Sequence, residues 1–113
     1  MKTILATSLL IIIISSCASD NEEDLFEGAE CNDELSLTDD ISPIINTNCA
    51  LANCHAAAQS PNLSTKAGII SNAARIRAVT QNGSMPPSSS GKSLSEAQVK
   101  QIACWVDNGA QNN

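Results

Sequence analysis

The stretch Cys-Ala-Leu-Ala-Asn-Cys-His, residues 49–55, has the clearest chemical meaning in the chain. Two thiols at this separation can add to the two vinyl groups of a haem, and a histidine directly after the second thiol is then placed under the iron. The usual spacing for covalent haem attachment is C-x-x-C-H, whereas this chain has C-x4-C-H. The adjacent Cys54–His55 pair is the essential part, because the first thiol needs only to reach the other vinyl group.

The motif alone allows two other interpretations. Cys49 and Cys54 can form a disulfide, with His55 next to them by chance. The same three side chains can also bind zinc, although two thiols and one histidine leave a structural zinc site one ligand short of four. Cys31 or Cys104 would then supply the fourth ligand.

The N-terminal region has the pattern of an exported bacterial lipoprotein. The basic Lys2 precedes an apolar run over residues 4–14, which is too short to span a bilayer comfortably. The sequence Ile-Ser-Ser-Cys at residues 14–17 resembles a bacterial lipobox, where the signal is cut before the cysteine. We expect a signal peptide over residues 1–16 and a lipid on Cys17, rather than a plain signal with an incidental cysteine. The lipid would hold the protein at the outer membrane, on its periplasmic face or at the cell surface.

Charge is distributed unevenly along the chain. Ten of the twelve acidic residues lie between Asp20 and Asp40, so we expect residues 17–37 to form a solvated tether. From Ile41 onward there are five basic residues but no dense basic stripe. Together with export, this argues against nucleic acid as a partner.

Met85 is the candidate for a second axial ligand of a haem iron. His55 is the only histidine, and Met85 is the only methionine beyond the expected signal peptide. A thioether is a soft ligand that suits haem iron and raises its reduction potential relative to a second imidazole. Pro86 and Pro87 would restrict the loop that holds the sulfur. Packing into a gap of the core is the alternative role for this side chain.

Apolar residues at helical spacing predict a first helix over residues 39–47. Asp39 or Asp40 at its start would cap the free backbone N–H groups. Two further helical segments are expected over residues 65–71 and 72–80.

The last helix has the strongest local signal. Ser95 and Gln98 form an S-x-x-Q capping box, and Gly109 suits the residue that ends the helix. The segment before it, residues 81–91, is rich in glycine, serine and proline and predicts an extended loop. No segment shows the period of two that is typical of a strand, so we expect an all-α domain over residues 38–113.

The order of these features resembles the single-haem cytochrome c fold. Three stretches are similar to the planctomycete-type cytochrome c domain, which is often found in bacterial lipoproteins. They are Ile-Ile-Asn-Thr-Asn-Cys at residues 44–49, Met-Pro-Pro at residues 85–87, and Ile-Ala-Cys-Trp-Val-Asp-Asn-Gly-Ala at residues 102–110. The likeness covers about residues 38–113 and implies about four short helices around one covalent haem c.

The resemblance also implies the ligands and a disulfide. The cysteines that attach haem map to Cys49 and Cys54, the axial histidine to His55, and the methionine before two prolines to Met85. In the cytochrome c fold the first and last helices cross in contact. The two remaining cysteines, one before the first helix and one on the last, would then pair as the disulfide Cys31–Cys104.

These features predict an electron carrier, not an enzyme, that transfers single electrons between unidentified redox proteins. An iron whose two axial positions are filled favours outer-sphere electron transfer over activation of oxygen or peroxide. The alternatives are a haem enzyme or gas sensor in which Met85 leaves the iron, a haem subunit of a larger redox complex, and a haem-free binding module stapled by disulfides.

Arg75 and Arg77 are candidates to neutralise a haem propionate, because a guanidinium pairs well with a carboxylate. A solvated helix face explains both residues equally well. The sequence does not choose between these roles.

Overall fold

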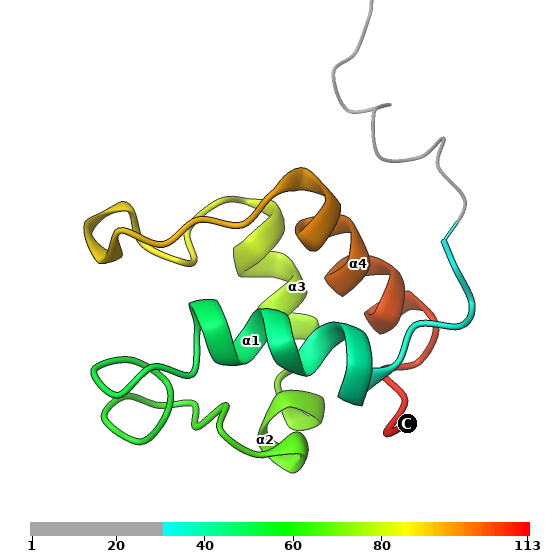
Figure 1. The fold of residues 1–113 in the computed structure, drawn as a ribbon, viewed down its shortest axis with the longest axis horizontal. Helices are drawn as coiled ribbons and strands as arrows, with labels where there is room; N and C mark the ends of the chain where they lie inside the picture. The colour runs from blue at the N-terminus through cyan, green and yellow to red at the C-terminus, as the bar shows by residue number, and fades with distance from the viewer. Residues whose placement is uncertain (1–30) are drawn as a thin grey trace, which may run out of the picture.

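The structure is a computed structural model that describes residues 31–113. The expected signal peptide over residues 1–16, the lipid site expected at Cys17 and most of the acidic tether lie outside the described residues. In the described part of the chain all regular secondary structure is helical, as expected for the all-α class. The elements are η2 (Leu37–Ile41), α1 (Ser42–Asn48), α2 (Lys66–Ser71), α3 (Ala73–Gln81), η3 (Ser88–Ser90) and α4 (Glu96–Asp107) (Figure 1).

The first helical segment begins two residues earlier than predicted, and its cap is a different residue. The hydroxyl oxygen of Ser36 accepts hydrogen bonds from the backbone N–H groups of Thr38 and Asp39, at 3.1 and 3.2 Å. The carboxylate of Asp40 accepts a hydrogen bond from the Ser36 N–H at 2.7 Å. The predicted cap at Asp39 or Asp40 is therefore wrong. A wide π-helical first turn lets Ser36 act as the cap while Asp40 binds back to it.

The later helices agree with the sequence. Helices α2 and α3 lie within one residue of the predicted segments. Helix α4 begins after Ser95 with both hydrogen bonds of the capping box, since Gln98 N–H donates to the Ser95 hydroxyl and Ser95 N–H donates to the Gln98 side chain. After α4 the chain turns at Gly109, whose φ of 97° favours glycine.

The core is shared by η2 and the four α-helices, together with Leu63 of the loop after α1. Helix α4 packs against η2 and α3, and α2 packs against α3. Trp105 is buried in this core, and its indole N–H donates to the Gln111 carbonyl at 3.1 Å. The largest fully buried side chains are Trp105, Leu37, Ile41, Ile45 and Ile102.

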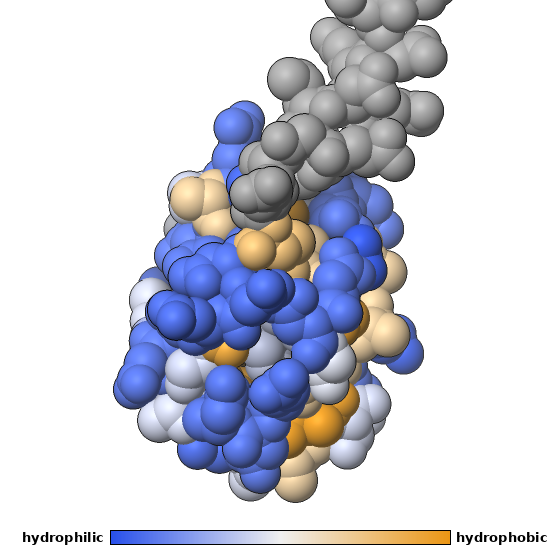
Figure 2. Space-filling model, turned by 90° about the vertical axis from the view of Figure 1, so that its right-hand side faces the viewer, coloured by the Kyte–Doolittle hydropathy of each residue, from blue (hydrophilic) through white to orange (hydrophobic). Residues whose placement is uncertain are grey.

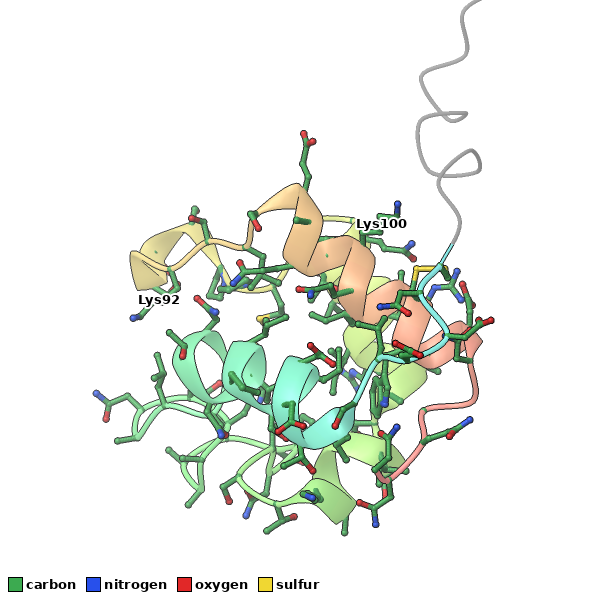
Figure 3. The ribbon with its side chains drawn as sticks, turned by 45° about the vertical axis from the view of Figure 1, so that its right-hand side comes forward. Lys92 and Lys100 are labelled. Carbon is green, nitrogen blue, oxygen red and sulfur yellow. A yellow bond between two sulfur atoms is a disulfide. The ribbon has the colours of Figure 1, made fainter. Side chains whose placement is uncertain are left out.

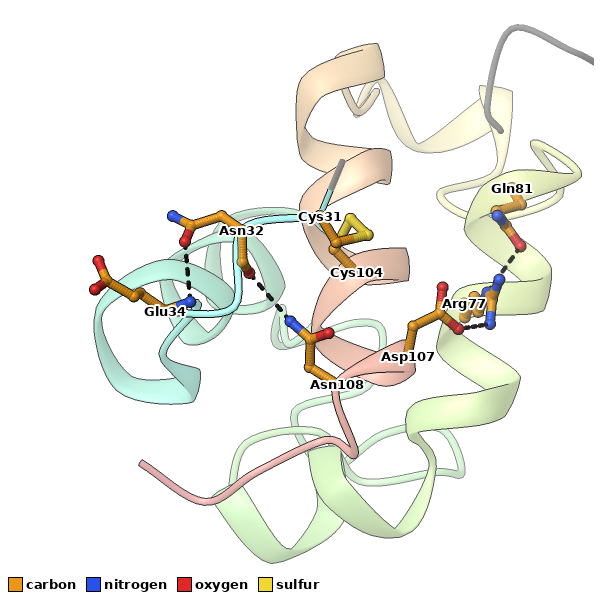
Figure 4. The surroundings of a disulfide bond; sticks show 8 residues. All are labelled: Cys31, Asn32, Glu34, Arg77, Gln81, Cys104, Asp107 and Asn108. Carbon is orange, nitrogen blue, oxygen red and sulfur yellow. Dashed lines mark hydrogen bonds and ion pairs between the residues drawn. A yellow bond between two sulfur atoms is a disulfide. The ribbon is translucent and has the colours of Figure 1, made fainter. Parts of the chain in front are cut away.

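A disulfide ties the start of the described chain to the last helix. Cys31 and Cys104 are bonded, with their Cα atoms 5.3 Å apart (Figure 4). Next to the bridge, the Asn108 side chain donates a hydrogen bond to the Asn32 carbonyl at 3.1 Å. This pair is the one that the cytochrome resemblance implies.

Two long loops project to the same end of the molecule. They follow α1 and α3 and lie at the left of Figure 1, whereas the described chain begins on the opposite side. That opposite side, seen in Figure 2, is mostly hydrophilic with small separate hydrophobic patches. Among residues 31–113 there is no helix with the length and apolar character needed to cross a membrane.

Candidate functional site

An open cavity of about 230 Å³ lies between the loop after α1, helix α3 and the loop after α3. Cys49, Cys54, His55 and Met85 all line it. The structure therefore brings together the four residues that the sequence singles out, although Met85 lies 30 positions beyond His55 (85 − 55). The apolar part of the wall comes from Leu63, Ile76, Val79, Pro86 and Pro87.

The two thiols lie at the start and near the middle of the loop after α1. Both are free, with Cys49 buried and Cys54 half-buried. The N–H of Cys49 still donates to the Ile45 carbonyl at 2.8 Å, so this residue continues the last turn of α1. The N–H of Cys54 donates to the Leu51 carbonyl at 2.9 Å. The longer spacing between the thiols is thus folded into a compact turn.

His55 is held by its backbone and by its ring. Its N–H donates to the Cys49 carbonyl at 3.1 Å, and its carbonyl accepts from the Leu63 N–H at 2.7 Å. The ring Nδ1 lies 3.0 Å from the Pro61 carbonyl oxygen. Because a carbonyl oxygen can only accept, this bond requires the proton on Nδ1. In a neutral ring with this proton, Nε2 carries the lone pair with which an imidazole binds a metal.

Gly68 allows the loop that holds His55 to take its position. A Cβ atom at this residue would overlap the carbonyl oxygen of Asn62, next to Pro61. The Gly68 N–H also donates to the Thr65 hydroxyl, which caps α2. Sequence reasoning missed Gly68 and Pro61, because their roles depend on contacts that exist only after α2 packs on the loop.

Met85 reaches the cavity because the chain folds back on α3. Its N–H donates to the Val79 carbonyl at 3.0 Å, and the Ser84 hydroxyl donates to the same oxygen at 3.3 Å. Gly83, with a φ of 74°, makes the turn. In the part of the chain that the structure describes, Met85 is the one exposed large apolar side chain, at 37%. Packing into the core therefore does not account for this methionine.

Arg75 and Arg77 have different surroundings. Arg77 forms an ion pair with Asp107 of α4, and its Nε donates to the Gln81 side chain at 3.3 Å (Figure 4). Arg75 instead lines the cavity.

The structure provides no free cysteine to act as the fourth ligand that the zinc interpretation requires. Cys31 and Cys104 are joined to each other, so neither is free to complete a site with Cys49, Cys54 and His55. Within residues 31–113, no three His, Cys, Asp or Glu side chains are grouped in a way that could hold a metal ion.

The two cavity thiols differ in their expected reactivity. Burial raises the pKa of the Cys49 thiol, and the neighbouring Cys54 raises it further. The thiolate is the reactive form of a cysteine. Because its pKa is raised, Cys49 has a smaller thiolate fraction at a given pH than an ordinary cysteine has. In the haem-free protein we expect iodoacetamide to modify Cys54 several-fold faster than Cys49, with the gap narrowing as the pH rises. Peptide mass mapping over time measures both rates, and equal rates in the folded protein would contradict the arrangement. Unfolded protein, where both thiols are exposed, is the control.

Comparisons with models of protein families, with curated proteins and with solved structures find no match. The fold and the site define a small helical domain with one Cys-His pair, a second thiol and a thioether around an open cavity.

Proposed function

We propose that this chain is a small c-type cytochrome with the cytochrome c-like fold, resembling the planctomycete-type domain, and that it carries single electrons between redox proteins. One haem c would be bound covalently through Cys49 and Cys54, with His55 and Met85 as axial ligands of the iron. A lipid on Cys17 would hold the exported protein at the membrane. The observation that supports this most is the convergence of four residues from two separate loops on one cavity.

The thiols are suited to attach such a group. Each is free, and each would add its S–H across one vinyl C=C, with a new C–S bond and the hydrogen on the adjacent carbon. No atom is lost and no oxidant is needed. The Cys31–Cys104 bond keeps the other two described cysteines out of this reaction.

The imidazole is suited to hold the iron, and the cavity would cover only part of the haem. The bond from Nδ1 of His55 to the Pro61 carbonyl orients the ring and leaves Nε2 for iron. The cavity of about 230 Å³ is smaller than the roughly 300–1,000 Å³ of pockets that enclose a drug-sized ligand. A group as large as haem would therefore keep an edge at the surface, as electron exchange with another protein requires.

A bound haem supplies an iron that gains and loses one electron reversibly. His55 and Met85 would hold the iron from two sides, so an external ligand would have to displace one of them. The cavity lining contains no carboxylate and no second histidine to move protons. These features favour an electron carrier over a haem enzyme.

Spectroelectrochemistry of the purified protein tests this function. We expect one reversible one-electron transition, and a reduced absorption spectrum that carbon monoxide does not change on mixing. Rapid binding of carbon monoxide would contradict the carrier and favour a haem enzyme or gas sensor. A stable oxidoreductase partner in a pull-down would favour a subunit of a larger redox complex. Absence of haem stain on a denaturing gel would favour the haem-free, disulfide-stapled module.

A further inference from the structure

Arg75 is the one charged residue that lines the cavity. The loop after α1 adds no charge, since residues 49–65 contain no Asp, Glu, Lys or Arg, and the loop after α3 adds only Lys92, which does not line the cavity. Arg75 lies on α3 and is exposed. Arg75 is therefore the only cationic side chain of the lining that could pair with an anionic group in this cavity.

Helix geometry separates Arg75 from its neighbour Arg77. The α3 residues at the cavity are Arg75, Ile76, Val79 and Thr80, which fall on one face at intervals of one and four. Two residues along a helix correspond to about 200°, so Arg77 points to the other side, where it meets Asp107. One arginine of the helix is paired within the protein and the other faces the cavity.

The other N–H donors of the lining side chains are engaged with the backbone. Asn48 donates to the Ile44 carbonyl, Asn72 to the Gly68 carbonyl and Gln59 to the Asn53 carbonyl. Arg75 has no hydrogen bond or ion pair with another residue of the described chain. Its guanidinium thus keeps its planar set of donors for a partner outside the protein.

The lysines do not share this position. Figure 3 shows Lys92 on the loop after α3 and Lys100 on α4, and neither lines the cavity. Lys66 donates to the Thr38 hydroxyl near the start of η2. Among the five cations from Ile41 onward, only Arg75 faces the candidate site.

We propose that Arg75 is a positioning residue that binds a haem propionate and balances its charge. The inference rests on the proposed function, because the carboxylate belongs to the haem. A guanidinium offers two parallel N–H donors that match a carboxylate, and an exposed site at the cavity suits the water-seeking end of an otherwise apolar group.

Pairing between Arg75 and a propionate would change the reduction potential of the iron in a definite direction. Oxidised iron carries one more positive charge than reduced iron, so a nearby propionate favours the oxidised form unless a cation balances it. Arg75 provides that cation and raises the reduction potential. It also keeps the propionate ionised to lower pH.

The test compares haem-loaded R75Q with the parent protein and with R77Q, by measuring the reduction potential as a function of pH. We expect R75Q to have a lower reduction potential than the parent at neutral pH. As the pH is lowered, the potential of R75Q should begin to rise at a higher pH than that of the parent. R77Q removes the same charge from the side of α3 that faces Asp107 and not the cavity. We therefore expect its potential profile to match that of the parent. Glutamine has a helix propensity close to that of arginine, and Arg75 is exposed, so the helix should be retained.

The outcomes separate this inference from the proposed function. Profiles of R75Q and the parent that superpose, or equal shifts in R75Q and R77Q, would overturn the role of Arg75 while leaving the haem in place. A parent protein without covalent haem would instead overturn the proposed function and the inference with it. If circular dichroism shows that R75Q has lost its helices, R75A decides beside R77A, because alanine also removes the charge and has the highest helix propensity. A downward shift of the potential in R75A alone supports the pairing, and no shift overturns it.

Discussion

Met85→Ala is expected to convert the haem-loaded protein from one that ignores carbon monoxide into one that binds it fully on mixing. In the proposed site the variant would remove the thioether of Met85, and His55, the only histidine, would already hold the iron from the other side. The reduction potential should fall as well, because a thioether ligand favours reduced iron. Stopped-flow mixing of the reduced protein with carbon monoxide measures the change.

The loop should survive this substitution. The bond that returns it to α3 runs from the backbone N–H of Met85 to the Val79 carbonyl, and alanine keeps that donor. Ser88→Ala, in the same loop but outside the cavity lining, is the matched control and should behave like the parent. An M85A protein that remains unreactive to carbon monoxide would remove Met85 from the iron.

Replacing both bridged cysteines, C31S/C104S, is expected to lower the free energy of unfolding by about 4 kcal/mol. The disulfide joins residues 73 positions apart, so it restricts a long loop of the unfolded chain. A loss of this size is a large part of the roughly 5–15 kcal/mol that stabilises a typical domain. Urea unfolding of the haem-loaded proteins measures it.

Reductant provides the control for the disulfide. Thioether bonds to haem are not cleaved by thiols, so dithiothreitol should act on the Cys31–Cys104 bond alone. The parent in dithiothreitol should approach the stability of C31S/C104S, and the double variant should not change. The hydrogen bond from Asn108 to Asn32 also joins this segment to the end of α4. A loss of less than about 1 kcal/mol would show that such contacts, and not the bridge, hold this segment.

Local signals were enough to predict some elements. The Ser95–Gln98 capping box predicted the start of α4, because both of its bonds lie within one helical turn. The start of the first helix was predicted wrongly. Ser36, Asp39 and Asp40 are all good caps, and the choice follows from the wide turn that begins with the fully buried Leu37.

In the candidate site, too, some features could be predicted from the sequence and others depend on the packing of distant segments. The Cys-His pair and Met85 could be found from residue type and count. The Pro61 carbonyl that orients His55, and the need for glycine at position 68, arise from packing between separate segments. Arg75 and Arg77 are equivalent in the sequence, and only the positions of α4 and the cavity distinguish them.

The mass of the intact, denatured protein tests the central claim most directly. Protein from a host that matures c-type cytochromes should weigh one haem more than its polypeptide and lipid, because two thioether bonds form without loss of atoms. Alkylation should then find neither Cys49 nor Cys54 free, and the C49S/C54S variant should lack the added mass. A parent protein without haem, whose Cys49 and Cys54 are alkylated or joined to each other, would contradict the account.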